Sequence, residues 1–405
     1  MARPGPLEGV RVADFTWAWA GPYATMLLSL MGAQVIKVES RARLDHSRMR
    51  SLAAGPVPGG PDEAPFFNDL NLGKLSVTLN LTHPKAVALA RRLIALCDVV
   101  ADNMRPGAMD RLGLGYPALR EVKPDIIVLS ASACGAKGPE RSYAGYAPTF
   151  GGLGGLAYIT GYPDGLPGTL MGSVDLRSAV SASFAIMAAL CHRRRTGQGQ
   201  YIDFSSQEAI SVLMGEVVLD YTMNGRVQSR TGNQQDALAP HRCYRCRGED
   251  KWVSIAVTTE EEWRALCRAI GKSEWLTDER FSDGYRRWQH REELDRLISE
   301  WTGRHTHYEV METLQKAGVA AAPSFNSQEL FRDPHSRERD IFQQVEHPRI
   351  GKRWVVGPPW KMSATPPRVS GPGPLLGQHN PYVFGELLGL SPQEIAELQG
   401  EGAIH

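Results

Sequence analysis

Strand and helix patterns alternate along the first 130 residues, and this alternation limits the possible folds more than any other feature. A strand pattern at 10–16 is followed by a helix that begins at Pro22, and Gly32 ends this helix before a strand at 35–39. The pattern then repeats, with strands expected at 75–79, 98–101 and 125–130 and helices at 84–96 and 106–122. The chain is therefore predicted to be an α/β protein with a mostly parallel sheet and helices on both faces.

The carboxyl ends of the predicted strands are the expected ligand-binding edge, because ligands of such sheets bind there. The first βα loop lacks the G-x-G-x-x-G sequence of dinucleotide-binding proteins. The glycine-rich stretch at 145–172 lacks the Lys and Ser/Thr of a phosphate-binding P-loop. Trp17 and Trp19 lie in the first of these edge loops, where they either close the end of the sheet or line an apolar pocket.

A second feature is the segment Met171-Gly172-Ser173-Val174-Asp175, which leads directly into a helical pattern at 176–195 and the stop sequence Thr196-Gly-Gln-Gly199. We expect an apolar stripe to bury this helix, formed by Leu176, Val180, Phe184, Met187 and Cys191. Asp175 then lies at a rigid helix start. It is either a nucleophile or simply the N-cap of the helix, and the pattern alone allows both readings.

The amino-acid composition limits the classes of partner that the chain is expected to bind. Its 405 residues contain 45 Lys and Arg against 44 Asp and Glu, a net charge of +1, which gives no reason to expect nucleic acid or a membrane as partner. The six cysteines lie mostly in apolar patterns and indicate buried thiols in a reducing compartment. With no apolar signal segment at the N-terminus and no long apolar run, we expect a cytoplasmic protein with a small-molecule partner.

The sequence divides into three predicted parts. Residues 1–223 form a large domain, residues 224–330 a linker and a smaller α/β domain, and residues 331–405 a proline-rich tail that ends in a helix capped by Ser391 and Glu394. Cys243 and Cys246 form a C-x-x-C unit without a second pair, so we expect strand cysteines and no metal site.

Seven short motifs are spread in order over nearly the full length: Asp14-Phe-Thr with Ala20-Gly-Pro22, Gly32-Ala-Gln-Val-Ile-Lys-Val-Glu39, Asn103-Met-Arg-Pro-Gly107, Gly138-Pro139, Asp175, Thr196-Gly-Gln-Gly199 and Leu376-Gly-Gln-His379. Together they resemble the family III CoA-transferases. This family includes formyl-CoA transferase, carnitine CoA-transferase and benzylsuccinate CoA-transferase, with α-methylacyl-CoA racemases as relatives. The resemblance implies a Rossmann-like large domain, a smaller α/β domain, a tail that returns to the large domain, and two chains threaded as interlocked rings.

By the same resemblance, Asp175 falls on the family's catalytic aspartate. The implied reaction moves CoA from an acyl-CoA to a free carboxylic acid through an aspartyl mixed anhydride and an aspartyl-CoA thioester. A CoA thioester is then a substrate, and no tightly bound cofactor or metal is expected. The positions that match the family's CoA contacts are Trp19, Ala20, Leu79, Asn103, Met104, Arg105, Arg111 and Ser132.

Two departures from the family pattern bear on the substrate. Ser40 replaces an arginine that several relatives carry, although Arg41 follows, and Trp19 replaces the glutamine of formyl-CoA transferase. The second change favours a bulkier, less polar acyl group than formate or oxalate. Succinyl-CoA is the candidate donor and an aromatic or branched dicarboxylate such as benzylsuccinate the candidate acceptor.

Two alternatives remain at this point. Racemases of the group pair the aspartate with a histidine in a Gly-His-Asp segment, because moving an α-proton needs two acid/base groups. This chain has Gly145-Tyr146-Ala147 there, which makes an α-methylacyl-CoA racemase or epimerase the lesser reading. The chain is expected to act as a homodimer or, alternatively, as one subunit of a heteromeric CoA-transferase with a related partner.

Overall fold

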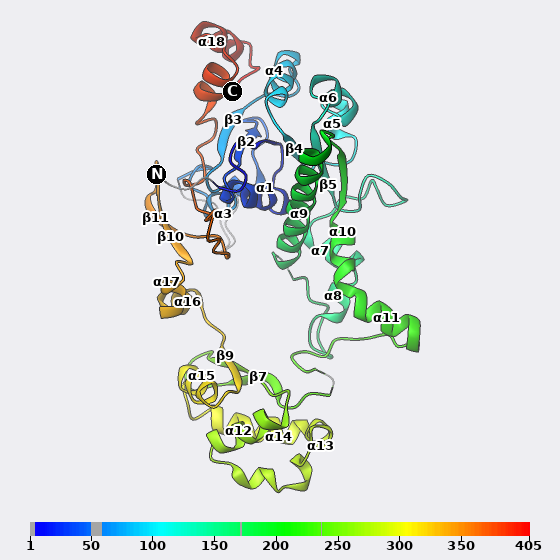
Figure 1. Cartoon of the computed structure of the whole chain (residues 1–405), viewed down its shortest axis with the longest axis vertical. Coiled ribbons are helices and arrows are strands. Elements are labelled where there is room, and N and C mark those ends of the chain that lie inside the picture. Colours follow the sequence, from blue (N-terminus) through cyan, green and yellow to red (C-terminus); the bar gives the residue numbers. More distant parts are fainter. Residues whose placement is uncertain (1–4, 50–58, 171, 236) are drawn as a thin grey trace. The chain divides into compact units, whose positions relative to one another are not determined.

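The computed structural model describes residues 5–49, 59–170, 172–235 and 237–405 (Figure 1). The chain divides into two compact units. The larger unit contains the described residues up to Ala157, then Thr169–Val227 and His335–His405, and the smaller unit contains Tyr158–Gly168 and Gln228–Pro334. The boundaries at 223/224 and 330/331 stay a prediction.

The larger unit is built on a parallel sheet of six strands in the order β3-β2-β1-β4-β5-β6. The strands are β1 Arg11–Asp14, β2 Gln34–Glu39, β3 Leu75–Thr78, β4 Val99–Asp102, β5 Ile127–Ser132 and β6 Tyr201–Ser205. Each predicted strand is present within two residues of its expected bounds. The prediction of an α/β fold with a parallel sheet is confirmed, and the strand order is that of doubly wound dinucleotide-binding folds.

Successive residues of β1 face opposite sides of the sheet, and each side is covered by helices. Val12 packs in the core with residues of α1 and α9, whereas Ala13 packs with residues of α4, α6 and the C-terminal segment. The helices of this unit are α1 Ala20–Leu30, α2 His46–Met49, α3 Pro65–Leu70, α4 Pro84–Ala95, α5 Ala108–Arg111, α6 Tyr116–Val122, α7 Ala147–Leu153, α8 Leu156–Ile159, α9 Ser173–Thr196, α10 Ser206–Ser211 and α11 Gly215–Asn224. A 3-10 turn, Val212–Met214, separates α10 from α11.

The predicted apolar stripe of α9 is wrong at three of its five residues, whereas Leu176 and Met187 are partly buried. Phe184 is 74% exposed and Val180 55% exposed, and Cys191 is exposed as well. The buried face consists mainly of small side chains: Val174, Ser178, Ala179, Ala182, Ser183, Ile186 and Ala189. Small residues let α9 pack closely on α1, where the Ser183 hydroxyl donates to the Ala24 carbonyl at 2.9 Å.

Helix α9 is also long and apolar enough to cross a membrane, and among the described residues it is the one helix of this kind. In the larger unit it packs against α1 and the sheet, and 44% of its apolar window is buried there. Its length and apolar character therefore match those of a core helix.

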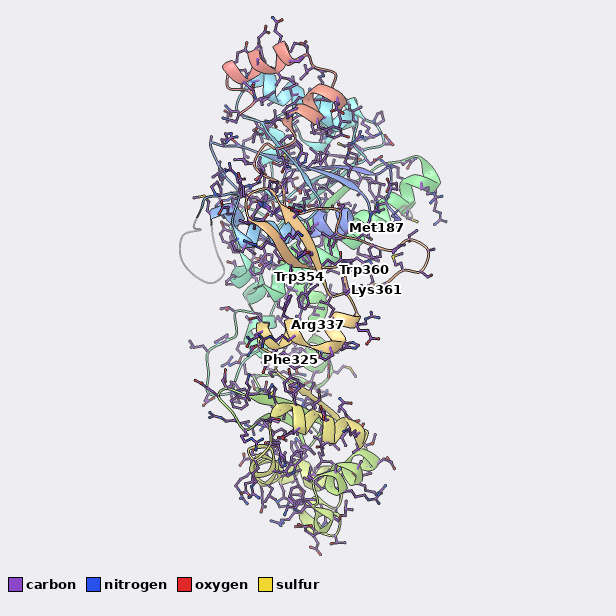
Figure 2. The ribbon with its side chains drawn as sticks, turned by 90° about the vertical axis from the view of Figure 1, so that its left-hand side faces the viewer. Met187, Phe325, Arg337, Trp354, Trp360 and Lys361 are labelled. Atoms are coloured by element: carbon purple, nitrogen blue, oxygen red, sulfur yellow. The ribbon has the colours of Figure 1, made fainter. Side chains whose placement is uncertain are left out.

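The C-terminal segment returns to the sheet of the larger unit. It first forms an antiparallel hairpin, β10 Phe342–His347 with β11 Gly351–Val356, which carries the half-exposed Trp354 (Figure 2). The Asn380 side chain then accepts from the backbone N–H of Thr78 in β3 at 2.9 Å, and Ile404 pairs with Leu79. The segment contains a π-helix, Pro381–Leu387, and α18 Pro392–Gly400, whose capping box of Ser391 and Glu394 is present as predicted.

The smaller unit has an antiparallel sheet in the order β7-β8-β9. One face of this sheet packs on helices, and Tyr244 of the sheet and Trp263 of a helix belong to the shared core. Cys243 lies in β7, as expected, whereas Cys246 lies one residue beyond its end, and both thiols are free. The described residues contain no cluster of three potential metal ligands. The elements are β7 His241–Arg245, β8 Trp252–Ala256, α12 Glu260–Ala269, the 3-10 turns Ser273–Leu276 and Glu279–Phe281, α13 Gly284–Gln289, α14 Arg291–Thr302, α15 His307–Lys316, β9 Ala320–Pro323 and α16 Ser327–Arg332; α17 Pro334–Glu338 links back to the larger unit.

Candidate active site

A cavity of about 360 Å³ opens at the carboxyl ends of β1, β4 and β5, between α1 and α9. This is the sheet edge where a ligand was expected. Seven of the nine predicted site residues line the cavity. They are Trp19, Ala20, Asn103, Met104, Arg105, Ser132 and Asp175.

The other two predicted residues do not line this cavity. The Leu79 side chain is 1% exposed, in the core beneath the C-terminal segment, where its backbone pairs with Ile404. Arg111 is exposed at the end of α5, and its guanidinium lies near Gly107. Their contact with CoA stays a prediction.

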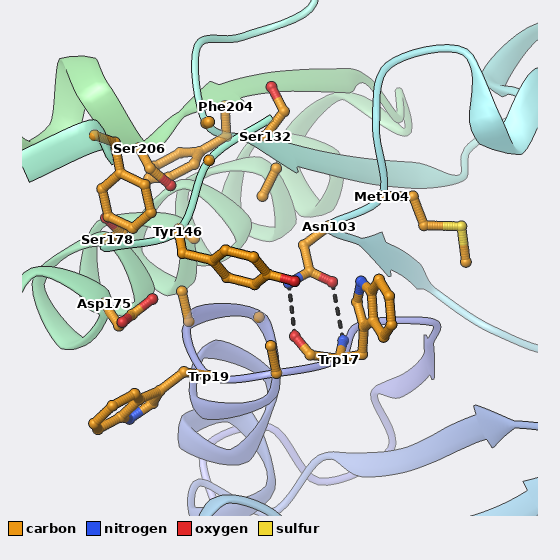
Figure 3. Close-up of a pocket in the computed structure, with 18 of the residues that line it drawn as sticks. Trp17, Trp19, Asn103, Met104, Ser132, Tyr146, Asp175, Ser178, Phe204 and Ser206 are labelled. Atoms are coloured by element: carbon orange, nitrogen blue, oxygen red, sulfur yellow. Dashed lines mark hydrogen bonds between the residues drawn. The ribbon is translucent and has the colours of Figure 1, made fainter. Parts of the chain in front are cut away.

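Asp175 is the third residue of α9 and extends into the cavity (Figure 3). Gly172 is the residue before the helix, so the interpretation of Asp175 as the N-cap is wrong. Met171, the first residue of this motif, lies outside the described residues. Burial raises the pKa of the Asp175 carboxyl to about 6 and is the only cause of the shift. The carboxylate is thus still mostly ionised at neutral pH but more basic than an exposed one.

Trp19 lies directly against the segment that leads into Asp175. A Cβ atom on Gly172 would come within 2.8 Å of Trp19 Cη2, and the backbone there has φ +86°. Both the position of the indole and the backbone conformation therefore require glycine. Phe66 packs against the indole in an edge-on arrangement, with 4.7 Å between the two ring centroids. The indole thus packs between Phe66 and the residue that precedes α9.

Three side chains hold the loop that carries Trp17 and Trp19: the buried Asp45 and Lys37 and the partly buried Asn103. Asn103 forms two hydrogen bonds with the backbone of Trp17: its Oδ1 accepts from the N–H at 2.9 Å and its Nδ2 donates to the carbonyl at 2.8 Å (Figure 3). Asp45 accepts from the N–H of Ala18 at 2.9 Å, and this residue has φ +69°. Lys37 Nζ donates to the Thr16 carbonyl at 2.6 Å. The strained loop is therefore held in one conformation from below.

Beneath the loop, Lys37 pairs with Asp45 and Lys74 pairs with Asp14, both at 2.9 Å. All four side chains are almost completely buried. Burial alone would raise the pKa of Asp14, but Lys74 and Lys37 outweigh it and hold that pKa below its usual value. Burial lowers the pKa of Lys74 to about 8, although Asp14 opposes this shift. Because a buried charge is costly when its partner is lost, these pairs tie the loop to the core.

Sequence reasoning missed one wall of the cavity. Arg43 and His46 lie on either side of residues 44–45 and both contact Trp17, and Tyr146 lies beside His46. From the sequence, Tyr146 was considered only as the residue that replaces the histidine of racemases. No local pattern could have found this wall, because His46 and Tyr146 are 100 residues apart.

Two hydroxyl groups at the cavity have no hydrogen-bond partner among the described residues. They belong to Ser132, at the end of β5, and to Ser178, one helical turn after Asp175. Ser178 is 1% exposed, so its hydroxyl is removed from bulk water. A buried, unpaired donor costs free energy in the absence of a ligand, and such groups deserve a functional explanation.

The comparison with protein-family models gives a match to CoA-transferase family III over residues 7–380. The chain belongs to this family. It is 34% identical to succinyl-CoA–D-citramalate CoA-transferase of Chloroflexus aurantiacus, covering 99% of this chain and 98% of that protein. It is 32% identical to the alpha subunit of succinyl-CoA–L-malate CoA-transferase of Chloroflexus aurantiacus, covering 100% and 95%.

A solved structure resembles nearly the whole chain. This is a CAIB/BAIF family protein from Brucella suis, with a TM-score of 0.86 and 29% identity, which covers 95% of this chain and 100% of that one. The family III CoA-transferase predicted from the seven motifs is therefore confirmed, both as a fold and as an enzyme class. A CoA thioester is the substrate that this class uses.

Proposed function

We propose that the protein transfers CoA from succinyl-CoA to a free carboxylic acid, and that Asp175 is the nucleophile. The observation that carries the proposal is the position of Asp175: an ionised but desolvated carboxylate at the rigid start of α9, inside the cavity. Succinyl-CoA as donor is supported by the two relatives named above, both of which use it. Their acceptors favour a dicarboxylic acid; an aromatic or branched acceptor stays a prediction.

The reaction would proceed through covalent intermediates on Asp175. A carboxylate oxygen attacks the thioester carbonyl carbon, the C–S bond breaks, and CoA leaves as thiolate from a mixed anhydride. The thiolate attacks the Asp175 carbonyl of this anhydride and releases succinate, which leaves an aspartyl-CoA thioester. The acceptor carboxylate displaces the thiolate to form a second anhydride, and attack of the thiolate on the acceptor carbonyl yields the new acyl-CoA and restores Asp175.

The hydroxyls of Ser132 and Ser178 fit the role of oxyanion donors in these steps. Each addition to a carbonyl places negative charge on its oxygen, and a preoriented donor in a dry site stabilises this charge by a few kcal/mol. Both hydroxyls are buried at the cavity and lack a partner among the described residues. Ser178 lies one turn from Asp175 on the same helix, as i and i+3 residues do.

The CoA moiety would lie along Asn103, Met104 and Arg105, which follow β4 at the mouth of the cavity. Arg105, and Arg111 on the nearby α5, would meet its phosphates, because a guanidinium binds phosphate through two parallel hydrogen bonds. Trp19 and Ala20 would border the pantetheine thiol. The indole is fixed by Phe66 and Gly172 and would keep water from the labile anhydride.

We also propose that two chains associate, as the interlocked rings expected for the family or as two related subunits. The support is a set of large apolar side chains of the larger unit that are each more than half exposed: Phe184 of α9, and Val218, Leu219, Tyr221 and Met223 of α11. Analytical ultracentrifugation is expected to give a mass near 89 kDa, twice the 44.5 kDa of the chain. A 44.5 kDa species that is fully active alone would contradict the proposal.

A transfer assay separates the proposed reaction from its alternative. Loss of succinyl-CoA must depend on an added free acid, and a new acyl-CoA must appear in equal amount. Deuterium uptake at the α-carbon of a 2-methylacyl-CoA without an acceptor would instead support racemisation. Inertness that is relieved by a second, related polypeptide would indicate one subunit of a heteromer. The free thiols also support the cytoplasm as the site of action, which cell fractionation tests.

A further inference from the structure

One wall of the cavity carries two basic side chains packed on a single indole. The Arg43 guanidinium carbon lies 4.3 Å from the centroid of the Trp17 ring, and the His46 ring centroid lies 4.6 Å from it. Tyr146 Oη lies 3.5 Å from His46 Nδ1. All four residues line the cavity that contains Asp175.

The charge of Arg43 is not used within the described part of the chain. No carboxylate there pairs with its guanidinium, which rests on the face of Trp17. A guanidinium that stacks through its face keeps the N–H donors on its edge free for a planar anion such as a carboxylate. The stack also orients the side chain, so less freedom is lost on binding.

Arg43 and Asp175 line the cavity from different elements: Arg43 lies between β2 and α2, and Asp175 lies in the first turn of α9. Burial is the only cause of the raised pKa of Asp175, whereas a nearby cation would lower it. The cavity therefore has a nucleophile in one part and a basic wall in another. Asp175 is the one carboxylate among the described residues that line the cavity, so an anionic acyl group would meet repulsion only at its reacting end.

We infer that Arg43, held by Trp17 and flanked by His46, binds the second carboxylate of a dicarboxylic acyl group. This inference rests on the proposed function, since it assigns the far end of the substrate whose near end reacts with Asp175. The chemistry of the wall fits an anion at a fixed distance from the thioester and disfavours a methyl group there. Arg43 is thus a specificity-determining residue, and the substrates are dicarboxylic acids and their CoA thioesters.

Two observations favour this role over a contact with the CoA phosphates. Arg105, an exposed lining residue just after β4, is the cation that the proposed function assigns to the CoA phosphates. The acids named for the two relatives, citramalate and malate, each carry two carboxylates. A site for such acids needs a cation away from the nucleophile, and Arg43 and His46 are the basic lining residues that remain.

The test compares succinyl-CoA with butyryl-CoA as donors. Their acyl groups have the same number of carbons and differ only in a terminal carboxylate or methyl. With one acceptor held constant, Arg43→Gln is expected to lower kcat/KM for succinyl-CoA by roughly 10- to 100-fold, the effect of one charge-assisted hydrogen bond, and to leave butyryl-CoA unchanged. Arg43→Lys keeps the charge without the planar fork and is expected to retain part of the preference.

Arg120→Gln is the matched control, because Arg120 also stacks on an aromatic ring, 5.8 Å from the centroid of Tyr116, but does not line the cavity. This substitution is expected to leave kcat/KM unchanged for both donors. Equal losses of kcat/KM for both donors in Arg43→Gln, or a matching loss of affinity for free CoA, would show that Arg43 binds the CoA phosphates, and would overturn the inference. An unchanged kcat/KM for succinyl-CoA in Arg43→Gln would overturn it as well. Failure of the proposed function is distinguishable, because Asp175 would then acquire no acyl label from either donor.

Discussion

Trp19 lies so close to Gly172 that no other residue fits at position 172: a Cβ atom there would be 2.8 Å from the indole. The contact joins the first βα loop to the start of α9, two segments that are 153 residues apart in the sequence. It fixes the aromatic wall of the cavity relative to Asp175, only three residues further on. In our proposal, the geometry of the reacting carboxylate depends on this contact.

Replacing Gly172 with Ala should therefore lower kcat strongly, while the free energy of unfolding falls only by the cost of the backbone strain. The added methyl displaces either Trp19 or the first turn of α9, and we expect at least a tenfold loss of kcat. Steady-state kinetics and urea unfolding measure the two effects. Gly197→Ala, at the other end of the same helix, is the control: its φ is +73°, but a Cβ there meets no atom within 4 Å. Both variants carry about 1 kcal/mol of backbone strain, and only Gly172→Ala should lose activity.

Ser178→Ala tests the proposed oxyanion donor. Removing the hydroxyl should lower kcat by about 100-fold without destabilising the fold, because the group has no protein partner in the described structure. Ser183→Ala on the same helix is the contrast, since that hydroxyl bonds to the carbonyls of Ala24 and Ala179. It should cost about 1 kcal/mol of stability and leave kcat unchanged. An unaltered kcat in Ser178→Ala would mean that this hydroxyl has no part in the reaction.

Asp45→Asn should destabilise the protein strongly. The substitution can keep the hydrogen bond to Ala18 but leaves the Lys37 charge buried without its partner, at a cost of about 3–5 kcal/mol. Chemical denaturation measures the loss. Glu401→Gln breaks the exposed pair with Lys85, whose side chains are 42% and 58% exposed, and should cost at most about 1 kcal/mol. Similar losses in the two variants would show that the buried pair does not anchor the loop.

The pH dependence of the acyl-CoA reaction should report the carboxyl of Asp175. Since only the ionised form attacks, kcat/KM is expected to rise tenfold per pH unit below pH 6 and to level off near pH 7, in line with the raised pKa of about 6. Burial also raises the pKa of Asp102 to about 7, although hydrogen bonds from the Met104 N–H and Ser130 oppose the shift. Asp102→Asn should leave the inflection of the kcat/KM profile at pH 6. If the inflection disappeared in this variant, the profile would report Asp102 instead of Asp175.

The sheet was predictable because its signal is local. Strands β1 to β5 each show their own pattern, and turn residues such as Gly32 separate a helix from the next strand. The hairpin of β10 and β11 was not predicted. The motif residues Trp19, Asn103 and Asp175 follow strands or begin a helix, so their convergence at one edge follows from the parallel arrangement.

Two other features were not predictable from local patterns. The buried face of α9 is formed by small residues such as Ser178 and Ala182, which carry little hydrophobic signal, while Phe184 on the exposed face carries a strong one. The stripe was therefore assigned to the wrong face. Arg43 was missed because its role depends on contacts with Trp17 across a loop, which no periodicity encodes.

The most direct test of Asp175 as the nucleophile is mass spectrometry of the protein after incubation with succinyl-CoA and hydroxylamine. Hydroxylamine attacks an activated aspartyl carbonyl and converts the side chain to a hydroxamate, which adds 15 Da to the peptide that contains Asp175. We predict this modification at Asp175 in the wild type and its absence in Asp175→Ala. An unmodified Asp175 in protein that turns over succinyl-CoA, or an Asp175→Ala variant with full activity, would contradict the account.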